Sequence, residues 1–206
     1  MRFHPERHHR RSIRLKGYDY SQPGAYFINV CTRERSCMFG DVVNGEMQLN
    51  GYGHIAVGCW KEIPLHFPEA SLDAFVVMPN HVHGIVMIRD DDNNVGAMHA
   101  SPLPAPSHAG LRGPQRQSVS SIVASFKSAV TKRINEYRGT PGAPVWQRSY
   151  YEHIIRNEES LNRIREYILT NPMRWALDHE NPYREGVDPF DKWMNNFMRR
   201  EQSDAR

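Results

Sequence analysis

The sequence predicts an α+β fold in which helices cover an antiparallel β-sheet. Two observations carry this prediction: short apolar runs occur in pairs joined by tight turns, and stretches with helical spacing separate the pairs. Long apolar strands that alternate one by one with helices, the pattern of a parallel sheet, are not seen. With 206 residues, of which 39% are hydrophobic, the chain is long enough to bury the core of one such domain.

Strand patterns dominate the first half of the chain. Residues 25–32 are rich in aromatic and β-branched side chains, and Asn44-Gly45, the strongest short hairpin signal, lies between two short strand-like runs. Residues 72–78 and 81–88 are apolar runs joined by a proline and an asparagine. We expect these two runs to form a tight antiparallel pair.

Three stretches have apolar side chains four positions apart, which is the spacing of an amphipathic helix. The first spans residues 52–67 and is closed by Pro68. The second spans residues 118–137 and has a basic flank. The third spans residues 158–171 and is capped by Asn157. The expected buried stripes consist of Ile55, Cys59, Ile63 and Phe67; Ile122, Phe126, Val130 and Ile134; and Leu161, Ile164 and Ile168.

The order of these elements, with a short extended piece within residues 144–157, favours a ferredoxin-like topology as its leading form. An acidic, proline-rich stretch after the paired strands has almost nothing to fill a core, so we read it as an insertion. A weak helical pattern around residues 189–200 is expected to fray. The predicted parts are a basic N-terminal arm (residues 1–20), one domain (21–175) with the insertion at about 90–117, and a C-terminal extension (176–206).

The charge and the cysteine content limit which classes of protein the sequence fits. The pI is about 8.8, and basic side chains gather in the arm, which suits either a polyanion or a solvated tail without a partner. The three cysteines lack a CxxC spacing, so we expect reduced thiols and a cytoplasmic protein. No stretch approaches about twenty consecutive apolar residues, so neither a membrane span nor a secretory signal is expected.

Two histidines interrupt the apolar run "VVMPNHVHGIV" of residues 76–86. His81 and His83 are two positions apart on a predicted strand, so their rings project from one face, and Ile85 continues that face. Two imidazoles on a rigid strand can bind one metal ion, but a pair of ordinary half-buried histidines has the same pattern. A metal site needs a further ligand, for which His153 is one candidate, although it could instead contact a phosphate.

The predicted helix of residues 158–171 offers a second group of polar side chains. Arg163, Tyr167 and Asn171 are four positions apart, so they form one stripe beside the buried stripe. A tyrosine and an amide therefore lie one helical turn apart at the edge of the helix. A helix tyrosine taken alone is most often a packing residue.

These segments together resemble a known family. "MPNHVHGIV" and "WQRSYYEHIIRNEESLNRIREYILTNP" are similar to the single-tyrosine HUH transposases, and within them to the REP-associated tyrosine transposases. His81-Val82-His83 matches the histidine-hydrophobic-histidine motif, and Tyr167 in "YILTNP" matches the nucleophile. Asn171 matches the third metal ligand of the family. The resemblance extends from "RRSIRLKGYDYSQPGAYFINVCTRER" to about Trp175, except for the insertion.

The resemblance implies a ferredoxin-like sheet, the HUH nuclease fold, with the histidine pair on a central strand. It implies a Mg²⁺ or Mn²⁺ ion held by His81, His83 and Asn171. It also implies cleavage and rejoining of single-stranded DNA beside palindromic hairpins, through a 5′-phosphotyrosyl link at Tyr167. Two imidazoles and an amide are softer ligands than Mg²⁺ prefers, so ligand type alone favours Mn²⁺.

Alternatives stay open at this point. Tyr150 and Tyr151 are rival nucleophiles, although only Tyr167 has an amide one helical turn later. The protein could bind DNA hairpins with a silent active site. It could also be a metal-dependent hydrolase that activates water and forms no covalent intermediate.

DNA contacts are expected on the basic arm and on the second predicted helix. Lysines and arginines there could track phosphates, and aromatic side chains could stack on unpaired bases, although core packing is at least as common for a tryptophan. The candidates are Arg10, Arg11, Arg14, Lys16, Lys127, Lys132, Arg133, Trp146 and Tyr150. The resemblance implies a monomer or homodimer that acts on single-stranded DNA hairpins in the cytoplasm, in association with the nucleoid.

Overall fold

The computed structural model describes residues 18–89 and 118–203. The predicted insertion and nearly all of the predicted arm, with Arg10, Arg11, Arg14 and Lys16, lie outside these ranges. The described elements, in chain order, are β1 (Gly24–Cys31), η2 (Arg33–Arg35), β2 (Gly40–Val43), β3 (Glu46–Leu49), α1 (Gly51–Lys61), α2 (Ile63–His66), β4 (Ala70–Val77), β5 (His81–Ile88), α3 (Val119–Arg138), β6 (Tyr151–Ile155), α4 (Glu158–Thr170), η3 (Pro172–Leu177) and α5 (Pro189–Ser203).

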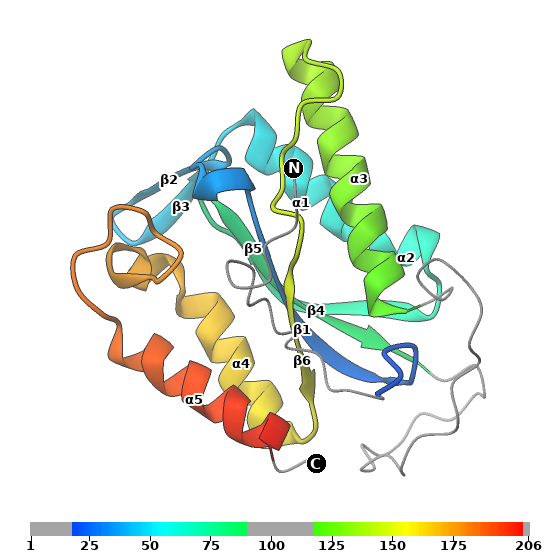
Figure 1. Cartoon of the computed structure of the whole chain (residues 1–206), viewed down its shortest axis with the longest axis vertical. Coiled ribbons are helices and arrows are strands. Elements are labelled where there is room, and N and C mark those ends of the chain that lie inside the picture. Colours follow the sequence, from blue (N-terminus) through cyan, green and yellow to red (C-terminus); the bar gives the residue numbers. More distant parts are fainter. Residues whose placement is uncertain (1–17, 90–117, 204–206) are drawn as a thin grey trace, which may run out of the picture.

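The main sheet contains four antiparallel strands in the order β4-β5-β1-β6 (Figure 1). Counted in chain order, these are the second, third, first and fourth strands of the sheet, which is the predicted ferredoxin-like arrangement. β4 and β5 are the expected tight pair, and Met78 donates its N–H to the carbonyl of His81 at 2.8 Å across the turn. β2 and β3 form the separate hairpin, with Asn44 at a positive φ of 53°.

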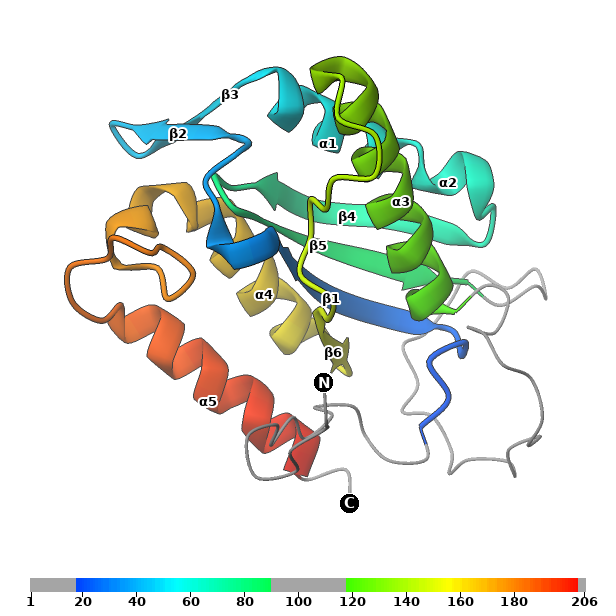
Figure 2. The same cartoon turned by 45° about the horizontal axis from the view of Figure 1, so that its top comes forward.

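Helices cover both faces of the sheet, which gives three layers (Figures 1 and 2). On one face, α1 and α3 bury side chains such as Trp60 and Ile134. On the other face, α4 packs against Phe27 of β1 and Ile85 of β5, and α5 adds Met194 to the same cluster. No helix in the described ranges is long and apolar enough to cross a bilayer.

β5 is buried on both faces, and its side chains alternate as predicted. Val82 and Val86 belong to the core beneath α1 and α3, whereas Ile85 belongs to the cluster beneath α4. His81 and His83 share the face of Ile85 and are 0% exposed. The histidine pair therefore lies on an inner strand, between β4 and β1, on the side covered by α4.

Gly84 lets the helices opposite the histidines come close to β5. A Cβ atom at this position would overlap the indole ring of Trp60, which is 1% exposed and packs on Phe126. We expect Gly84→Ala to lower the free energy of unfolding by about 1–3 kcal/mol, because the ring or the strand must shift. Chemical denaturation measures this loss. The control is Gly58→Ala in α1, where a Cβ would meet nothing within 4 Å; equal stability of the two variants would contradict the close packing.

The predicted helix of residues 52–67 is broken in two. α1 ends at Lys61 and the short α2 begins at Ile63, because Pro64 has no N–H to continue the hydrogen bonds of α1. The other two predicted helices match α3 and α4. The side chains of Ser118 and Asn157 cap them by accepting hydrogen bonds from backbone N–H groups in the first turn.

The weak helical pattern near the C-terminus forms α5, where we expected fraying. Met194 is 0% exposed, and Trp193 stacks on Phe197 with ring centroids 5.4 Å apart. Arg163 of α4 lies over the Trp193 ring at 5.0 Å. Apolar burial and this cation–π contact hold α5 on α4, a partner that its own sequence could not reveal.

Candidate active site

The two histidines of β5 are the centre of a buried polar cluster. Their ring centroids lie 4.4 Å apart, and His83 also packs on Phe27 of β1 at 5.3 Å. Tyr167, near the end of α4, places its ring 5.2 Å from His83. Asn171 caps the C-terminal end of α4 and is 1% exposed. The helix thus brings the predicted tyrosine and amide toward the predicted histidine pair.

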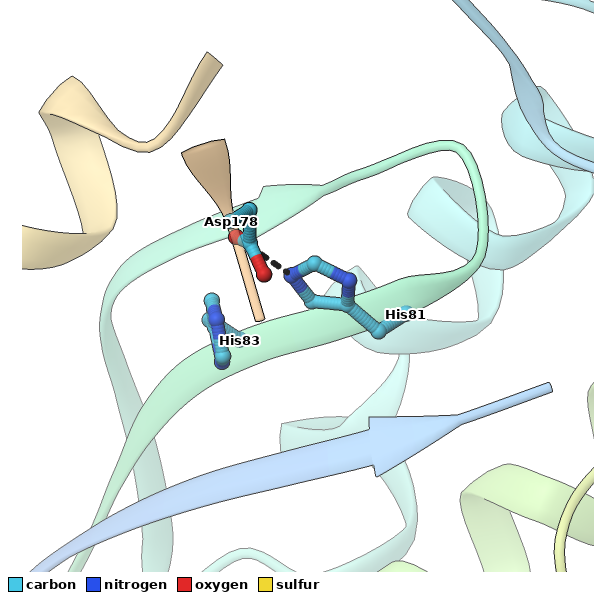
Figure 3. Close-up of side chains that lie close together, drawn as sticks. All are labelled: His81, His83 and Asp178. Atoms are coloured by element: carbon cyan, nitrogen blue, oxygen red, sulfur yellow. Dashed lines mark ion pairs between the residues drawn. The ribbon is translucent and has the colours of Figure 1, made fainter. Parts of the chain in front are cut away.

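Asp178, which directly follows η3, completes the cluster (Figure 3). Its Oδ2 lies 3.9 Å from Nε2 of His81, and ligand atoms of His81, His83 and Asp178 all lie within 4.8 Å of one another. Asn171 donates a hydrogen bond from Nδ2 to the same Oδ2 at 2.9 Å. A carboxylate, an amide and two imidazoles therefore meet in the interior of the protein.

Several polar atoms of this cluster have no hydrogen-bond partner within the described ranges. They are Nε2 of His81, both ring nitrogens of His83 and Oδ1 of Asn171. Leaving such buried groups unpaired costs about 1–3 kcal/mol each. A divalent cation would satisfy them, because imidazole nitrogens and amide or carboxylate oxygens are metal ligands. The donor set fits a metal ion.

Both histidines are held neutral, as metal binding requires. Burial lowers the pKa of His81, although the carboxylates of Asp178 and Glu180 act in the opposite direction. Burial, and then the neighbouring His81, lower the pKa of His83 well below its usual range. A neutral imidazole keeps a free lone pair on one nitrogen, so both rings can bind a cation at neutral pH.

Tyr167 is buried beneath α5. Its side chain is 3% exposed, and its hydroxyl donates a hydrogen bond to Oδ1 of Asp191 at 3.0 Å. Its ring stacks on Phe190 with centroids 6.1 Å apart. Burial, and then the negative charge of Asp191, raise the pKa of Tyr167 well above its usual range. In this arrangement the phenol is protonated and α5 covers it, so the hydroxyl is closed to solvent.

Charged pairs hold the segment between η3 and α5 on the histidine side of the sheet. His179 contacts Asp191 at 2.8 Å and Glu180 at 3.0 Å. Burial alone would lower the pKa of His179, but these two carboxylates outweigh it and raise that pKa to about 10. Glu180 also accepts a hydrogen bond from Arg35 at 2.6 Å. These contacts fix the position of Asp178, which precedes His179 in the chain.

Sequence reasoning missed Asp178 and Asp191. Both lie beyond residue 175, where we predicted the end of the domain, and the structure places side chains from both sides of that position in one cluster. One signal was available. The run Asp178-His179-Glu180 sets three acid–base side chains in succession, and such groups gather at functional sites.

Three of the predicted DNA-binding residues line an open groove beside α3. Lys127, Lys132 and Trp146, together with Arg148, border this groove, whose volume is about 540 Å³. Lys127 donates from Nζ to the carbonyl of Gln147 at 2.7 Å. Trp146 is only 8% exposed and belongs to the core beneath α3, so its ring packs inside the protein. The groove lies on the α3 side of the sheet, opposite the histidines.

The other predicted residues lie apart from the cluster. Arg133 forms two hydrogen bonds with the carboxylate of Glu62. The hydroxyl of Tyr150 donates a hydrogen bond to Oε2 of Glu152 at 2.9 Å. Tyr151 and His153 lie on the histidine face but on β6, which β1 separates from β5. The group of metal ligands found in the described ranges does not include His153.

Comparison with known proteins gives relatives of the whole domain. No protein-family model matches the chain. An uncharacterised protein of Haemophilus influenzae is 42% identical over 175 residues, which cover 83% of this chain and 92% of the relative. A second protein of that organism, named "Putative REP-associated tyrosine transposase", is 23% identical over 156 residues, which cover 76% of this chain and 74% of the relative.

A solved structure of a REP-associated tyrosine transposase bound to a REP hairpin has a similar fold. The TM-score is 0.51 with 19% sequence identity, and the match covers 79% of this chain and 74% of the other. The ferredoxin-like sheet with helices on both faces is therefore common to the two proteins. The chain belongs to the same family as the uncharacterised Haemophilus influenzae protein, and it has the fold of a REP-associated tyrosine transposase.

Proposed function

We propose that the protein is a transposase-like enzyme that cuts and rejoins single-stranded DNA at hairpins formed by REP-type palindromes. The observation that carries the proposal is the packing of Tyr167 against His83, beside buried ligand atoms without hydrogen-bond partners in the described ranges. A nucleophile next to a cation site is the arrangement that phosphodiester transfer to a phenol needs. The similarity to REP-associated tyrosine transposases supports the same class of reaction.

In the proposed reaction, Oη of Tyr167 attacks a phosphorus atom of the DNA. The Oη–P bond forms while the P–O3′ bond breaks, so the 5′ phosphate becomes linked to the enzyme. The phenol gives up its proton, and the leaving 3′ oxygen takes one up. A 3′ hydroxyl reverses these steps when it attacks the phosphotyrosyl link. Rejoining needs no ATP, because the phosphotyrosyl bond keeps the energy of the cut bond.

We propose that the metal ion is held by His81 and His83 through ring nitrogens and by Asn171 and Asp178 through oxygens. When bound, Mg²⁺ or Mn²⁺ supplies a Lewis acid that stabilises negative charge on the phosphoryl oxygens. The two imidazoles favour Mn²⁺. Asp178 adds a carboxylate oxygen, which makes the ligand set more acceptable to Mg²⁺ than the set predicted from the sequence.

The proposed substrate needs contacts beyond the reacting phosphate. We propose that Lys127 and Lys132 in the groove beside α3, together with the basic arm, bind phosphates of the hairpin. The protein is proposed to do so in the cytoplasm, close to the nucleoid, as a monomer or homodimer. Exposed side chains such as Lys132 would contribute to the affinity for DNA, and this contribution would decrease as the salt concentration increases.

A covalent trapping experiment tests the proposal. The protein is mixed with a labelled single-stranded hairpin oligonucleotide and Mn²⁺ or Mg²⁺, and a denaturing gel is examined for a protein–DNA adduct. We expect the wild type to form the adduct and Tyr167→Phe to lose it completely, because phenylalanine has no oxygen to attack with. Tyr150→Phe and Tyr151→Phe are the matched controls and should keep the adduct.

The outcomes separate the alternatives. An undiminished adduct in Tyr167→Phe, or no adduct from the wild type with either metal, would refute the proposal. Hairpin binding by a wild type that never cleaves would support a silent hairpin-binding protein. Cleavage that survives Tyr167→Phe would support a hydrolase that activates water.

A further inference from the structure

Asn80, the residue before His81, is fully buried and forms three hydrogen bonds. Its Nδ2 donates to the carbonyl of Arg35 at 3.1 Å and to the carbonyl of Glu180 at 2.7 Å. Its Oδ1 lies 2.9 Å from Nδ1 of His81. The side chain is 0% exposed, and each of its polar atoms faces a protein group. Asn80 therefore connects the histidine strand to two loops.

These contacts determine where the proton of His81 lies. Backbone carbonyl oxygens only accept hydrogen bonds, so the atom of Asn80 that faces Arg35 and Glu180 must be its NH₂ group. Its oxygen must then face the ring of His81. Because an amide oxygen also only accepts, Nδ1 of His81 must carry the ring proton. The lone pair of the neutral ring is then on Nε2, the atom that faces Asp178 at 3.9 Å.

We propose that Asn80 is a positioning residue that sets the tautomer of His81, so that Nε2 is the ligand atom for the metal. The proposal rests on the metal site of the proposed function, and Asn80 acts through His81 rather than on the DNA. With the proton on Nε2, the ring would point an N–H at the cation position, and binding would require the proton to move. Outer hydrogen-bond partners of ligating histidines have this role in metal sites generally.

The two loops that Asn80 contacts, one with Arg35 and one with Glu180, support this role. The turn that includes η2 has two successive residues other than glycine with positive φ, Glu34 at 58° and Arg35 at 55°. A left-handed backbone conformation costs energy at such residues and persists only where surrounding contacts hold it. The carbonyl of Arg35 is fixed by Asn80, and Glu180 follows Asp178 by two positions. One amide group thus orients His81 and holds the segment that carries Asp178.

Two substitutions separate the effect of Asn80 on the His81 tautomer from its effect on the two loops. Asn80→Leu has a similar size and removes both the oxygen and the NH₂ group. Asn80→Asp keeps an oxygen that accepts from Nδ1 of His81 but loses the NH₂ group that holds the loops. If the tautomer is what matters for the metal, Asn80→Asp should impair metal binding less than Asn80→Leu, even though its buried carboxylate and the lost NH₂ group both destabilise the loops. If only the loops matter, the two variants should be equally impaired.

The test begins with ¹⁵N-labelled, metal-free protein. Long-range ¹H–¹⁵N correlation spectra report which ring nitrogen of each histidine carries the proton. We expect His81 to be protonated on Nδ1 in the wild type and in Asn80→Asp, and to lose this preference in Asn80→Leu. A wild-type His81 protonated on Nε2 would overturn the proposal directly, whatever the stability of the variants.

Metal affinity is the second measurement. Titration with Mn²⁺, followed by electron paramagnetic resonance of the free ion, should show about 10–100-fold weaker binding for Asn80→Leu. Asn80→Asp should bind the ion more tightly than Asn80→Leu, because its carboxylate oxygen still accepts from Nδ1 of His81. Equal loss in both variants would leave Asn80 a purely structural residue. Neither measurement uses DNA, so a failed trapping experiment would refute the proposed function and leave this inference standing.

Discussion

Replacing His83 by leucine is expected to raise the stability of the metal-free protein and to lower the proposed DNA cleavage by about 1,000-fold or more. His83 is 0% exposed, and neither ring nitrogen has a hydrogen-bond partner within the described ranges. Each unpaired buried group costs about 1–3 kcal/mol, and a leucine beside Phe27 and Ile85 has no such group. We expect the free energy of unfolding of the metal-free protein to increase by about 1–3 kcal/mol.

Cleavage should change in the opposite direction. Loss of a Lewis acid removes several kcal/mol of transition-state stabilisation, so we expect adduct formation to fall by about 1,000-fold or more. Urea denaturation in a chelator, repeated with Mn²⁺, measures both parts of the stability effect, since the wild type should gain stability from the ion and His83→Leu should not. His66→Leu, the same change at an exposed histidine, is the control. A large loss of stability in metal-free His83→Leu would show that the ring is a packing residue.

Undocking α5 is expected to speed up adduct formation at least tenfold. Tyr167 is 3% exposed beneath this helix and hydrogen-bonded to Asp191, so the proposed reaction requires α5 to open first. Met194→Asp places a carboxylate at a position that is 0% exposed among Leu161 and Ile168. Burying an unpaired charge costs several kcal/mol, so the helix should leave α4 instead. The observed rate then rises as the reactive fraction rises.

Two measurements check this second prediction. Hydrogen exchange of the α5 amides should accelerate in Met194→Asp, and single-turnover adduct formation with Mn²⁺ should accelerate with it. Asn196→Asp adds the same charge at an exposed position of the same helix and should change neither. Faster exchange together with a lost adduct would mean that α5 contributes to the reactive structure rather than covering it.

The parts of the site that lie on regular elements could be predicted from the sequence. Strand alternation places His81 and His83 on one face, and helical spacing places Tyr167 and Asn171 on one stripe, because both periods are fixed by backbone geometry. The four-strand order followed from the order of hairpins and helices. The predictions of the strand face and of the helix stripe concern short distances along the chain, where local geometry determines direction.

Asp178 and Asp191 could not be placed in the same way. Asp178 follows the 3₁₀ turn of η3, and its position depends on contacts of the next residue, His179, with Asp191 and Glu180. The burial of Tyr167 depends on α5, whose docking involves Arg163 and Met194. These are long-range contacts, and no spacing rule along a single segment encodes them.

The link between Asn80 and Glu180 spans 100 positions of the chain. The histidine strand therefore exists in a growing polypeptide long before the tyrosine helix and the segment with Asp178 have been synthesised. Such distant contacts form late, because a long loop must close before they stabilise anything. A chain released early from the ribosome carries the histidine pair but neither Tyr167 nor Asp178. The buried cluster of His81, His83 and Asp178 thus forms only after the chain has been synthesised beyond Asp178 and has folded.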